Sequence, residues 1–311
     1  MLIPFAFLAV GLVLLIVCAD VLVRGASGLA LRLGMTPLSV GLIVVAFGTS
    51  APELIASVVA GLAGSSGMAL GNVVGSNVSN IALVLGVAAV IRPLPVERQI
   101  LRVDAPISIA ASLLLVGFLL DGRLSRIEGG VLFAGIVAYV GWTLKKAKSG
   151  DIEAGEEVDE STASMPLWKA WGLAFIGLIG LSIGANLFVR GAQDLAAIFG
   201  ISEAVVGLTV MAIGTSLPEI ATVVAASMRG MSGLVTGNAI GSNIFNVLAV
   251  LGAAALIVPL DTKQLTQTDL IVFVASAVIV WGMMWGRSQL SRLEGALLLI
   301  AYVSYVVWLF L

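Results

Sequence analysis

The segment "AFGTSAPELIASVVAG", residues 46–61, returns later in the chain as "AIGTSLPEIATVVAAS", residues 212–227. The step from residue 46 to residue 212 is 166 positions, and the two copies share Gly, Thr, Ser, Pro and Glu in the same order. Each copy puts one glutamate directly after a proline inside an otherwise apolar run. This recurrence indicates a duplicated chain, and each glutamate needs a physical explanation.

Other short segments repeat with the same spacing of 166 positions. The matches are "ADVLVRGA" (19–26) with "ANLFVRGA" (185–192), "GNVVGSNVSN" (71–80) with "GNAIGSNIFN" (237–246), and "LSRIEG" (124–129) with "LSRLEG" (290–295). Because one spacing relates every match, we interpret the whole chain as two copies of one unit. Residues 1–144 form the first repeat, 168–311 form the second, and the acidic stretch 145–167 is a linker.

The composition predicts an all-α integral membrane protein. Of the 311 residues, 59% are hydrophobic and only 11% are charged, whereas a soluble domain carries about 25% charged residues. The first apolar run continues past Cys18, so we expect a spanning helix there and not a cleaved signal. Ten runs are long enough to cross a bilayer: 3–31, 37–61, 68–91, 104–120, 127–144, 168–198, 203–227, 234–257, 268–286 and 294–311.

An odd number of spans in each repeat inverts the second repeat relative to the first. We therefore predict ten transmembrane helices as two inverted five-helix repeats, a plan typical of secondary transporters with a site near the membrane midplane. With the N-terminus outside, one side of the membrane receives 12 of the 16 lysines and arginines. Since basic residues favour the cytoplasmic side, we expect a multi-pass cell (inner) membrane protein with both termini extracytoplasmic and the linker cytoplasmic.

The residue inventory also excludes several classes of function. The chain has no His, a single Cys and a net charge of −2, which argues against a histidine proton relay, a transition-metal site and a nucleic-acid partner. No nucleophile with a base, no metal triad and no cofactor loop is evident, so we expect neither an enzyme nor a cofactor. No feature of the sequence indicates an oligomeric state.

The glutamate motif has two interpretations. In the structural one, Ser50 caps a helix, Pro52 lies in its first turn and Glu53 closes a capping box, and the second copy does the same with Ser216, Pro218 and Glu219. A carboxylate in the middle of a spanning helix, however, costs about 2.5–3.5 kcal/mol and favours a functional role. Both prolines should also break their helices, near Gly48 and Gly214, and free carbonyl oxygens toward a cavity.

The second motif adds further oxygen ligands. Ser76 and Asn80 are four residues apart, as are Ser242 and Asn246, so each pair shares a helix face. Hydrogen bonding between helices is the alternative role for these side chains. Together with Glu53, Glu219 and the Thr and Ser of each GTS, they form an oxygen-only set suited to Ca²⁺ or Na⁺. Two carboxylates balance one Ca²⁺ or two Na⁺, so the ions would compete for one site, as in an antiporter.

At these motifs the chain resembles the cation/Ca²⁺ exchanger superfamily, and in particular its prokaryotic sodium/calcium antiporters, over its entire length. The resemblance implies Na⁺/Ca²⁺ exchange by alternating access, with Ca²⁺ bound by the carboxylates of Glu53 and Glu219. It also implies that backbone carbonyls near Ala46 and Ala212 add ligands, and that ion sites are lined by Thr49, Ser50, Ser76, Asn80, Thr215, Ser216 and Ser242. The family often has Asp where this chain has Asn246, which weighs against K⁺ cotransport or proton binding at a third carboxylate.

Other functions stay open at this stage. An H⁺-coupled cation antiporter would keep the fold and let the two glutamates take protons. A passive cation channel or a membrane scaffold belongs to a different class, but inverted halves and broken helices favour an occluded site.

The remaining charged residues have structural interpretations. Asp20 and Arg24 are four apart and could pair, while we interpret Arg24 and Arg190 as anchors at the membrane interface. The two LSRxEG segments are expected to be packing signals at helix starts.

Overall fold

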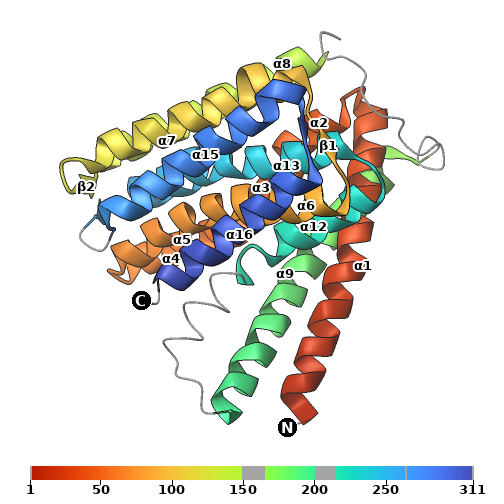
Figure 1. Cartoon of the computed structure of the whole chain (residues 1–311), viewed down its shortest axis with the longest axis horizontal. Helices are drawn as coiled ribbons and strands as arrows, with labels where there is room; N and C mark the ends of the chain where they lie inside the picture. The colour runs from red at the N-terminus through yellow and green to blue at the C-terminus, as the bar shows by residue number, and fades with distance from the viewer. Residues whose placement is uncertain (1, 149–164, 200–213, 263–264, 310–311) are drawn as a thin grey trace.

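The computed structural model describes residues 2–148, 165–199, 214–262 and 265–309. These residues form helices joined by short connections, together with four strands of two residues each (Figure 1). Eight helical segments within the described residues are long and apolar enough to cross a membrane: Leu2–Leu33, Pro37–Leu62, Ser66–Ile91, Ile100–Leu119, Arg126–Ala147, Leu167–Ile198, Ser232–Ile257 and Gln267–Arg287. The predicted helical membrane class is confirmed.

The remaining two predicted spans are not among these eight. The segment 203–227 is described only from residue 214 onward, and there it forms the shorter apolar helix α12, Leu217–Met228. The segment 294–311 corresponds to α16, Arg292–Leu309. The count of ten spans therefore stays a prediction.

Four of the spans are single helices, and the other four contain a wider, π-helical turn. The single helices are α1 (Leu2–Leu33), α8 (Arg126–Lys148), α9 (Leu167–Ile198) and α15 (Gln267–Arg287). The composite spans join α2 (Pro37–Val40), α3 (Ala46–Thr49) and α4 (Ala51–Leu62); α5 (Ser66–Ser79) and α6 (Leu85–Ile91); α7 (Ala105–Leu119) to the turn before it; and α13 (Ser232–Phe245) and α14 (Gly252–Ile257). Their π-helical turns are Gly41–Val45, Asn80–Val84, Ile100–Asp104 and Asn246–Leu251.

The short strands repeat the internal symmetry of the sequence. β1 (Leu94–Pro95) pairs antiparallel with β4 (Gln289–Leu290), and β2 (Arg123–Leu124) pairs antiparallel with β3 (Leu260–Asp261). Leu94 faces Leu290 in one ribbon and Leu124 faces Leu260 in the other. A shift of 166 residues exchanges these two pairs, so the repeat holds in the tertiary structure as well as in the sequence.

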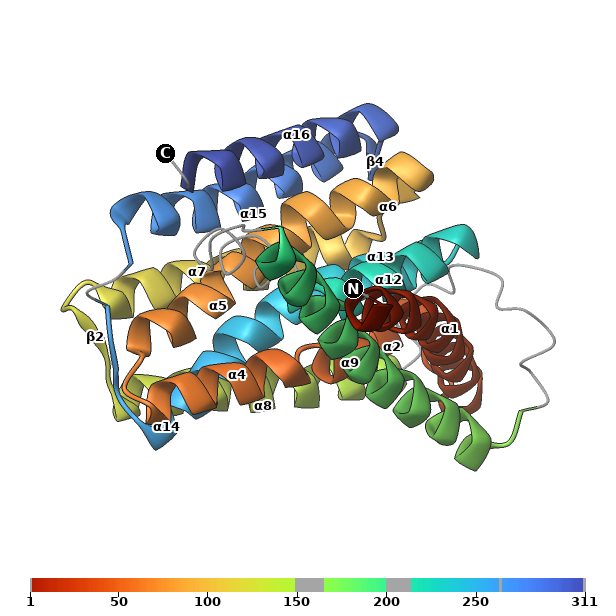
Figure 2. The same cartoon turned by 90° about the horizontal axis from the view of Figure 1, so that it is seen from below.

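Helices α1 and α9 occupy equivalent places in the two repeats and pack against each other in opposite directions. A Cβ added at Gly11 would lie 2.6 Å from the backbone nitrogen of Phe188, and one added at Gly25 would lie 2.5 Å from that of Ala174. Residue numbers therefore rise along α1 as they fall along α9, which is the relation that inverted repeats require. Both views place this pair side by side, extending away from the other helices (Figures 1 and 2).

Helix α13 lies at the centre of the molecule, and every one of its 14 residues is buried. Glycines let it approach the segment that carries the first glutamate motif. A Cβ at Gly237 would lie 2.7 Å from the Leu38 carbonyl oxygen, and one at Gly41 would lie 2.9 Å from the Leu234 carbonyl oxygen. Small residues permit such close contact between spanning helices, and here they bring residues 37–49 against α13.

The two LSRxEG segments are capping boxes, as expected of signals at helix starts. The backbone N–H of Ser125 donates to Glu128 Oε2 over 2.8 Å immediately before α8. The backbone N–H of Ser291 donates to Glu294 Oε2 over 2.7 Å immediately before α16. Each serine oxygen in turn accepts the backbone N–H of its glutamate, so both helices start with the same reciprocal pair of bonds.

Candidate cation site

The first glutamate motif interrupts its helix at Ser50. Helix α3 ends at Thr49, α4 begins at Ala51, and Pro52 lies in the first turn of α4. The break expected from Pro52 is therefore confirmed in the first repeat, with the Ala46 carbonyl still accepting the Ser50 N–H over 3.0 Å. The Thr49 hydroxyl lies 3.4 Å from the same carbonyl oxygen.

The second motif shows the same start of a helix after the break. Thr215 and Ser216 precede α12, and Pro218 lies in its first turn. Residues 200–213, which include the predicted carbonyl ligand Ala212, lie outside the described residues. The comparison of the two motifs is therefore limited to residues 48–53 and 214–219.

The capping-box interpretation of the two glutamate motifs is wrong. Neither Ser50 nor Ser216 makes a side-chain capping bond to its helix. Both hydroxyls are buried and have no hydrogen-bond partner among the described residues. The glutamates are therefore not held at these helix starts by the reciprocal bonds that Glu128 and Glu294 make.

The carboxylates of the two motif glutamates are buried, and no hydrogen bond from the described residues offsets the cost of that burial. Glu53 and Glu219 are each 1% exposed, and none of their four oxygens accepts a hydrogen bond within the described part of the chain. The Ser76 hydroxyl lies beside Glu53, the Thr49 hydroxyl lies beside Glu219, and the two carboxylates are close enough for their charges to interact. Such a pair is costly to bury unless protons or cations neutralise it.

The centre of the site combines side chains from both repeats. The Thr49 hydroxyl, at the end of α3, is 3.4 Å from the Ser242 hydroxyl on α13. Ser76 lies on α5, while Asn80 and Asn246 begin the π-helical turns that follow α5 and α13. Turns of this kind are frequent at functional sites. Among the described residues, no three His, Cys, Asp or Glu side chains gather to hold a metal ion, so any cation here would depend on two carboxylates with hydroxyl and amide oxygens.

An amide contact marks the place where the two repeats meet. Asn77 Nδ2 donates to the Asn243 carbonyl over 3.2 Å, and Asn243 Nδ2 donates to the Asn77 carbonyl over 3.3 Å. These residues are 166 positions apart, so the pseudo-twofold axis passes between them. Asn246 Nδ2 also donates to Asn77 Oδ1 over 3.0 Å, whereas the Asn80 amide has no partner among the described residues.

Sequence reasoning missed two asparagines of the GNxxGSN motif. Asn72 and Asn238 lie one helical turn before Ser76 and Ser242, and the four-residue spacing could have revealed that they share a face with them. Asn238 Oδ1 accepts a hydrogen bond from the Thr49 hydroxyl over 3.2 Å. Asn72 Nδ2 instead donates to Ser57 Oγ over 3.0 Å.

Comparison with known proteins gives one consistent result. The family model described as sodium/calcium exchanger protein matches residues 3–145 and again 169–311, in agreement with the two repeats. The putative antiporter CaxA of Alkalimonas amylolytica is 38% identical, covering 100% of this chain and 99% of that protein. The sodium/calcium exchanger MaX1 of Methanosarcina acetivorans is 30% identical, covering 98% of each chain.

The solved structures include a similar protein of the same kind. The sodium-calcium exchanger NCX_Mj, soaked with Na⁺ and Sr²⁺, matches with a TM-score of 0.85 and 31% sequence identity, covering 98% of both chains. The resemblance seen in the motifs is thereby confirmed over the full length. With a family model that matches both repeats and relatives similar from end to end, this chain belongs to the sodium/calcium exchanger family.

Proposed function

We propose that this protein is an antiporter that exchanges Ca²⁺ for Na⁺ by alternating access at a site between its two repeats. The observation that carries the proposal is the pair of buried carboxylates, Glu53 and Glu219, whose oxygens have no partner among the described residues. Two such charges are matched by one Ca²⁺ or by two Na⁺. Competition of the two ions for one site would couple their movements.

The oxygen-bearing side chains near the two carboxylates suit Ca²⁺ and Na⁺. Ca²⁺ takes about six to eight oxygen ligands in flexible geometry, and the Ser76 and Thr49 hydroxyls lie beside the two carboxylates. In this proposal the carboxylates hold Ca²⁺ and the remaining oxygens complete its shell or take Na⁺ in its place. The proposed ligands are Glu53, Glu219, Thr49, Thr215, Ser50, Ser216, Ser76, Ser242, Asn80 and Asn246, with the carbonyls of Ala46 and Ala212.

Inverted repeats supply a route to alternating access, because the two halves can exchange their conformations and open the site to the other side. The present conformation is asymmetric at equivalent positions, with Thr49 buried and Thr215 half-buried. The proposed topology has ten spans, extracytoplasmic termini and a cytoplasmic linker at 145–167. The distribution of basic residues in the sequence supports this orientation.

The decisive experiment is uptake of radioactive Ca²⁺ into proteoliposomes that contain the purified protein. Three conditions are compared: an outward Na⁺ gradient, a pH gradient of equal size, and no gradient. Uptake driven by the Na⁺ gradient alone is the expected result. Uptake driven by the pH gradient would replace Na⁺ with H⁺ as the coupling ion, and uptake that follows Ca²⁺ alone would favour a channel.

A further inference from the structure

Asn238 lies next to the proposed ion site but is not one of the proposed ligands. It is wholly buried on α13, in one line with Ser242 and Asn246 at successive four-residue steps. The Thr49 hydroxyl has three acceptors within reach: Asn238 Oδ1 at 3.2 Å, and the Ala46 carbonyl and Ser242 Oγ at 3.4 Å each. Asn238 is the nearest of the three.

The direction of this bond determines what the Thr49 oxygen can do. A hydroxyl has one hydrogen and two lone pairs, so donation to Asn238 leaves both lone pairs for other partners. The Glu219 carboxylate lies beside the Thr49 hydroxyl and is a competing acceptor for the same hydrogen, but no donor among the described residues bonds its oxygens at normal hydrogen-bond geometry. Two groups that can only accept then face the same space, and a cation is the partner that satisfies both.

We infer that Asn238 is a positioning residue, which draws the Thr49 hydrogen away from Glu219 and so turns the Thr49 oxygen toward the ion. The inference rests on the proposed function only for the identity of that ion. Its counterpart Asn72 makes different contacts, because its amide donates to Ser57 Oγ and to the Glu53 carbonyl. Among the contacts of the described residues, the bond to a motif threonine is therefore made by Asn238 and not by Asn72.

A double-mutant cycle on the full-length protein tests this role. Ca²⁺ binding is measured by titration calorimetry for wild type, Asn238→Leu, Thr49→Val and the double variant. Loss of the bond should weaken binding about tenfold in Asn238→Leu, and the double variant should bind no more weakly than Thr49→Val alone. Asn238→Asp keeps an acceptor at the same place and should retain most of the affinity.

Two results would overturn the inference: unchanged affinity in Asn238→Leu, or losses that add in the double variant. Asn238→Ala passes through the same cycle if the leucine variant does not fold. If the wild-type protein binds no Ca²⁺, the proposed function fails first, and the same cycle run with Na⁺ still decides the role of Asn238.

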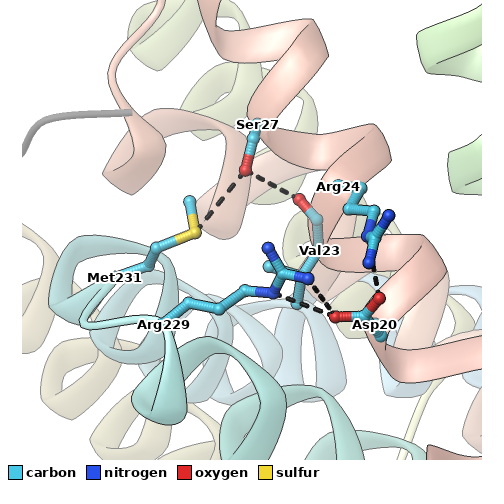
Figure 3. Close-up of polar contacts among 6 residues, drawn as sticks. All are labelled: Asp20, Val23, Arg24, Ser27, Arg229 and Met231. Carbon is cyan, nitrogen blue, oxygen red and sulfur yellow. Dashed lines mark hydrogen bonds and ion pairs between the residues drawn. The ribbon is translucent and has the colours of Figure 1, made fainter. Parts of the chain in front are cut away.

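A second, independent observation concerns the contact between α1 and the end of α12. Asp20 on α1 accepts a hydrogen bond from Arg229 Nε over 2.9 Å and is also paired with Arg24, 2.8 Å away on the same helix (Figure 3). Nearby, Ser27 on α1 contacts the sulfur of Met231 over 3.5 Å. Two side chains of α1 are thus tied to the connection between α12 and α13.

The other repeat cannot make this ion pair. The positions equivalent to Asp20 and Arg229 are Asn186 and Ala63, and the Asn186 amide donates to Ser182 on its own helix. Burial follows the same difference, since Thr222 on α12 is buried while its counterpart Ala56 on α4 is exposed. Helix α1 is therefore held to the end of α12 by an ion pair. The equivalent positions on α9 and after α4 carry no charged side chains that could form one.

The geometry points to the Asp20–Arg229 pair as a one-sided latch, which holds α1 on α12 and favours the present conformation over its inverted counterpart. The proposal rests on alternating access. The side chains are about one third exposed, 35% for Asp20 and 31% for Arg229, so the pair is worth a modest shift in population. Loss of an ion pair with this exposure should change the population ratio of the two conformations about two- to fivefold.

Hydrogen exchange tests the latch without reference to the transported ion. Asp20→Asn and Arg229→Gln should speed exchange about two- to fivefold at residues 217–231. Arg24→Gln is the matched control, because it removes an ion pair with the same carboxylate but none between helices, and it should leave this segment unchanged. Reversal of both charges, Asp20→Arg with Arg229→Asp, should restore slow exchange. Equal effects of Arg24→Gln and Arg229→Gln, or no effect of either latch variant, would overturn the proposal.

Discussion

The two repeats share their helix starts and strand ribbons but differ in the contacts of their central polar side chains. The capping boxes at Ser125 and Ser291 are equivalent, and so are the two strand ribbons. In contrast, Asn238 bonds the Thr49 hydroxyl while Asn72 bonds Ser57. Equivalent helix starts and strands thus accompany a polar centre whose contacts differ between the repeats, and the proposed alternating access requires such an asymmetry.

The largest expected effect is the loss of Ca²⁺ uptake when either motif glutamate is replaced. Both repeats should contribute equally here, because each supplies one carboxylate. Glu53→Gln and Glu219→Gln each leave one carboxylate at the proposed site, where two neutralise Ca²⁺, so either change should abolish Ca²⁺ uptake in proteoliposomes. Glu128→Gln is the matched control because that glutamate closes a capping box away from the site, and it should retain transport. Normal exchange by either site variant would move the ion site elsewhere.

The sequence was sufficient to predict the duplication, the helical membrane class, the break at the first glutamate motif and the LSRxEG helix starts. Each of these depends on residues that are close in the chain or repeat at a fixed spacing. The Asn77–Asn243 contact and the ion pair of Asp20 with Arg229 could not be predicted, because they join residues 166 and 209 positions apart. The Asp20–Arg24 pair was expected and is present, but Arg229 also shares that carboxylate.

Prediction of the site was correspondingly partial. The spacing of residues in the two motifs predicted the glutamates, Ser76, Ser242, and the asparagines Asn80 and Asn246. How these side chains lie relative to one another depends on helix packing, which local spacing does not determine. Asn238 was overlooked because an Asn on an apolar helix is also typical of hydrogen bonding between helices. Its contact with Thr49 depends on the close approach of α13 to residues 37–49, which glycines on both segments allow.

A second prediction tests the equivalence of the packing. Gly11 and Gly177 occupy the same place in α1 and α9, where an added Cβ would lie 2.6 Å from Phe188 N and 2.7 Å from Leu22 N, respectively. Substitution of either by Ala should cost about 1–3 kcal/mol of stability through overpacking. Thermal unfolding in detergent should show similar losses for both variants. Gly282→Ala is the control, because an added Cβ there would meet no atom of the described residues within 4 Å apart from the backbone of its own helix. Unequal losses in the other two variants would contradict the equivalence.

The smallest expected effect concerns the asymmetry at the axis. Asn246 donates to Asn77 Oδ1 over 3.0 Å, whereas the equivalent amide of Asn80 has no partner among the described residues. In Asn246→Asp an ionised carboxylate would face the Asn77 oxygen, so it should take up a proton or a cation to avoid the repulsion. Transport should persist, with a half-saturating Ca²⁺ concentration that changes less than about tenfold and becomes dependent on pH.

Asn80→Asp sharpens this comparison, because a carboxylate at Asn80 would face no such acceptor in the present conformation. Uptake measured across the neutral pH range for both variants should therefore give a stronger pH dependence for Asn246→Asp than for Asn80→Asp. If Asn246→Asp keeps the wild-type dependence on pH and on monovalent ions, residue 246 lies outside the ion shell. If the two variants respond alike, the difference between Asn80 and Asn246 does not persist through the cycle, and the axis contact has no part in selecting the conformation.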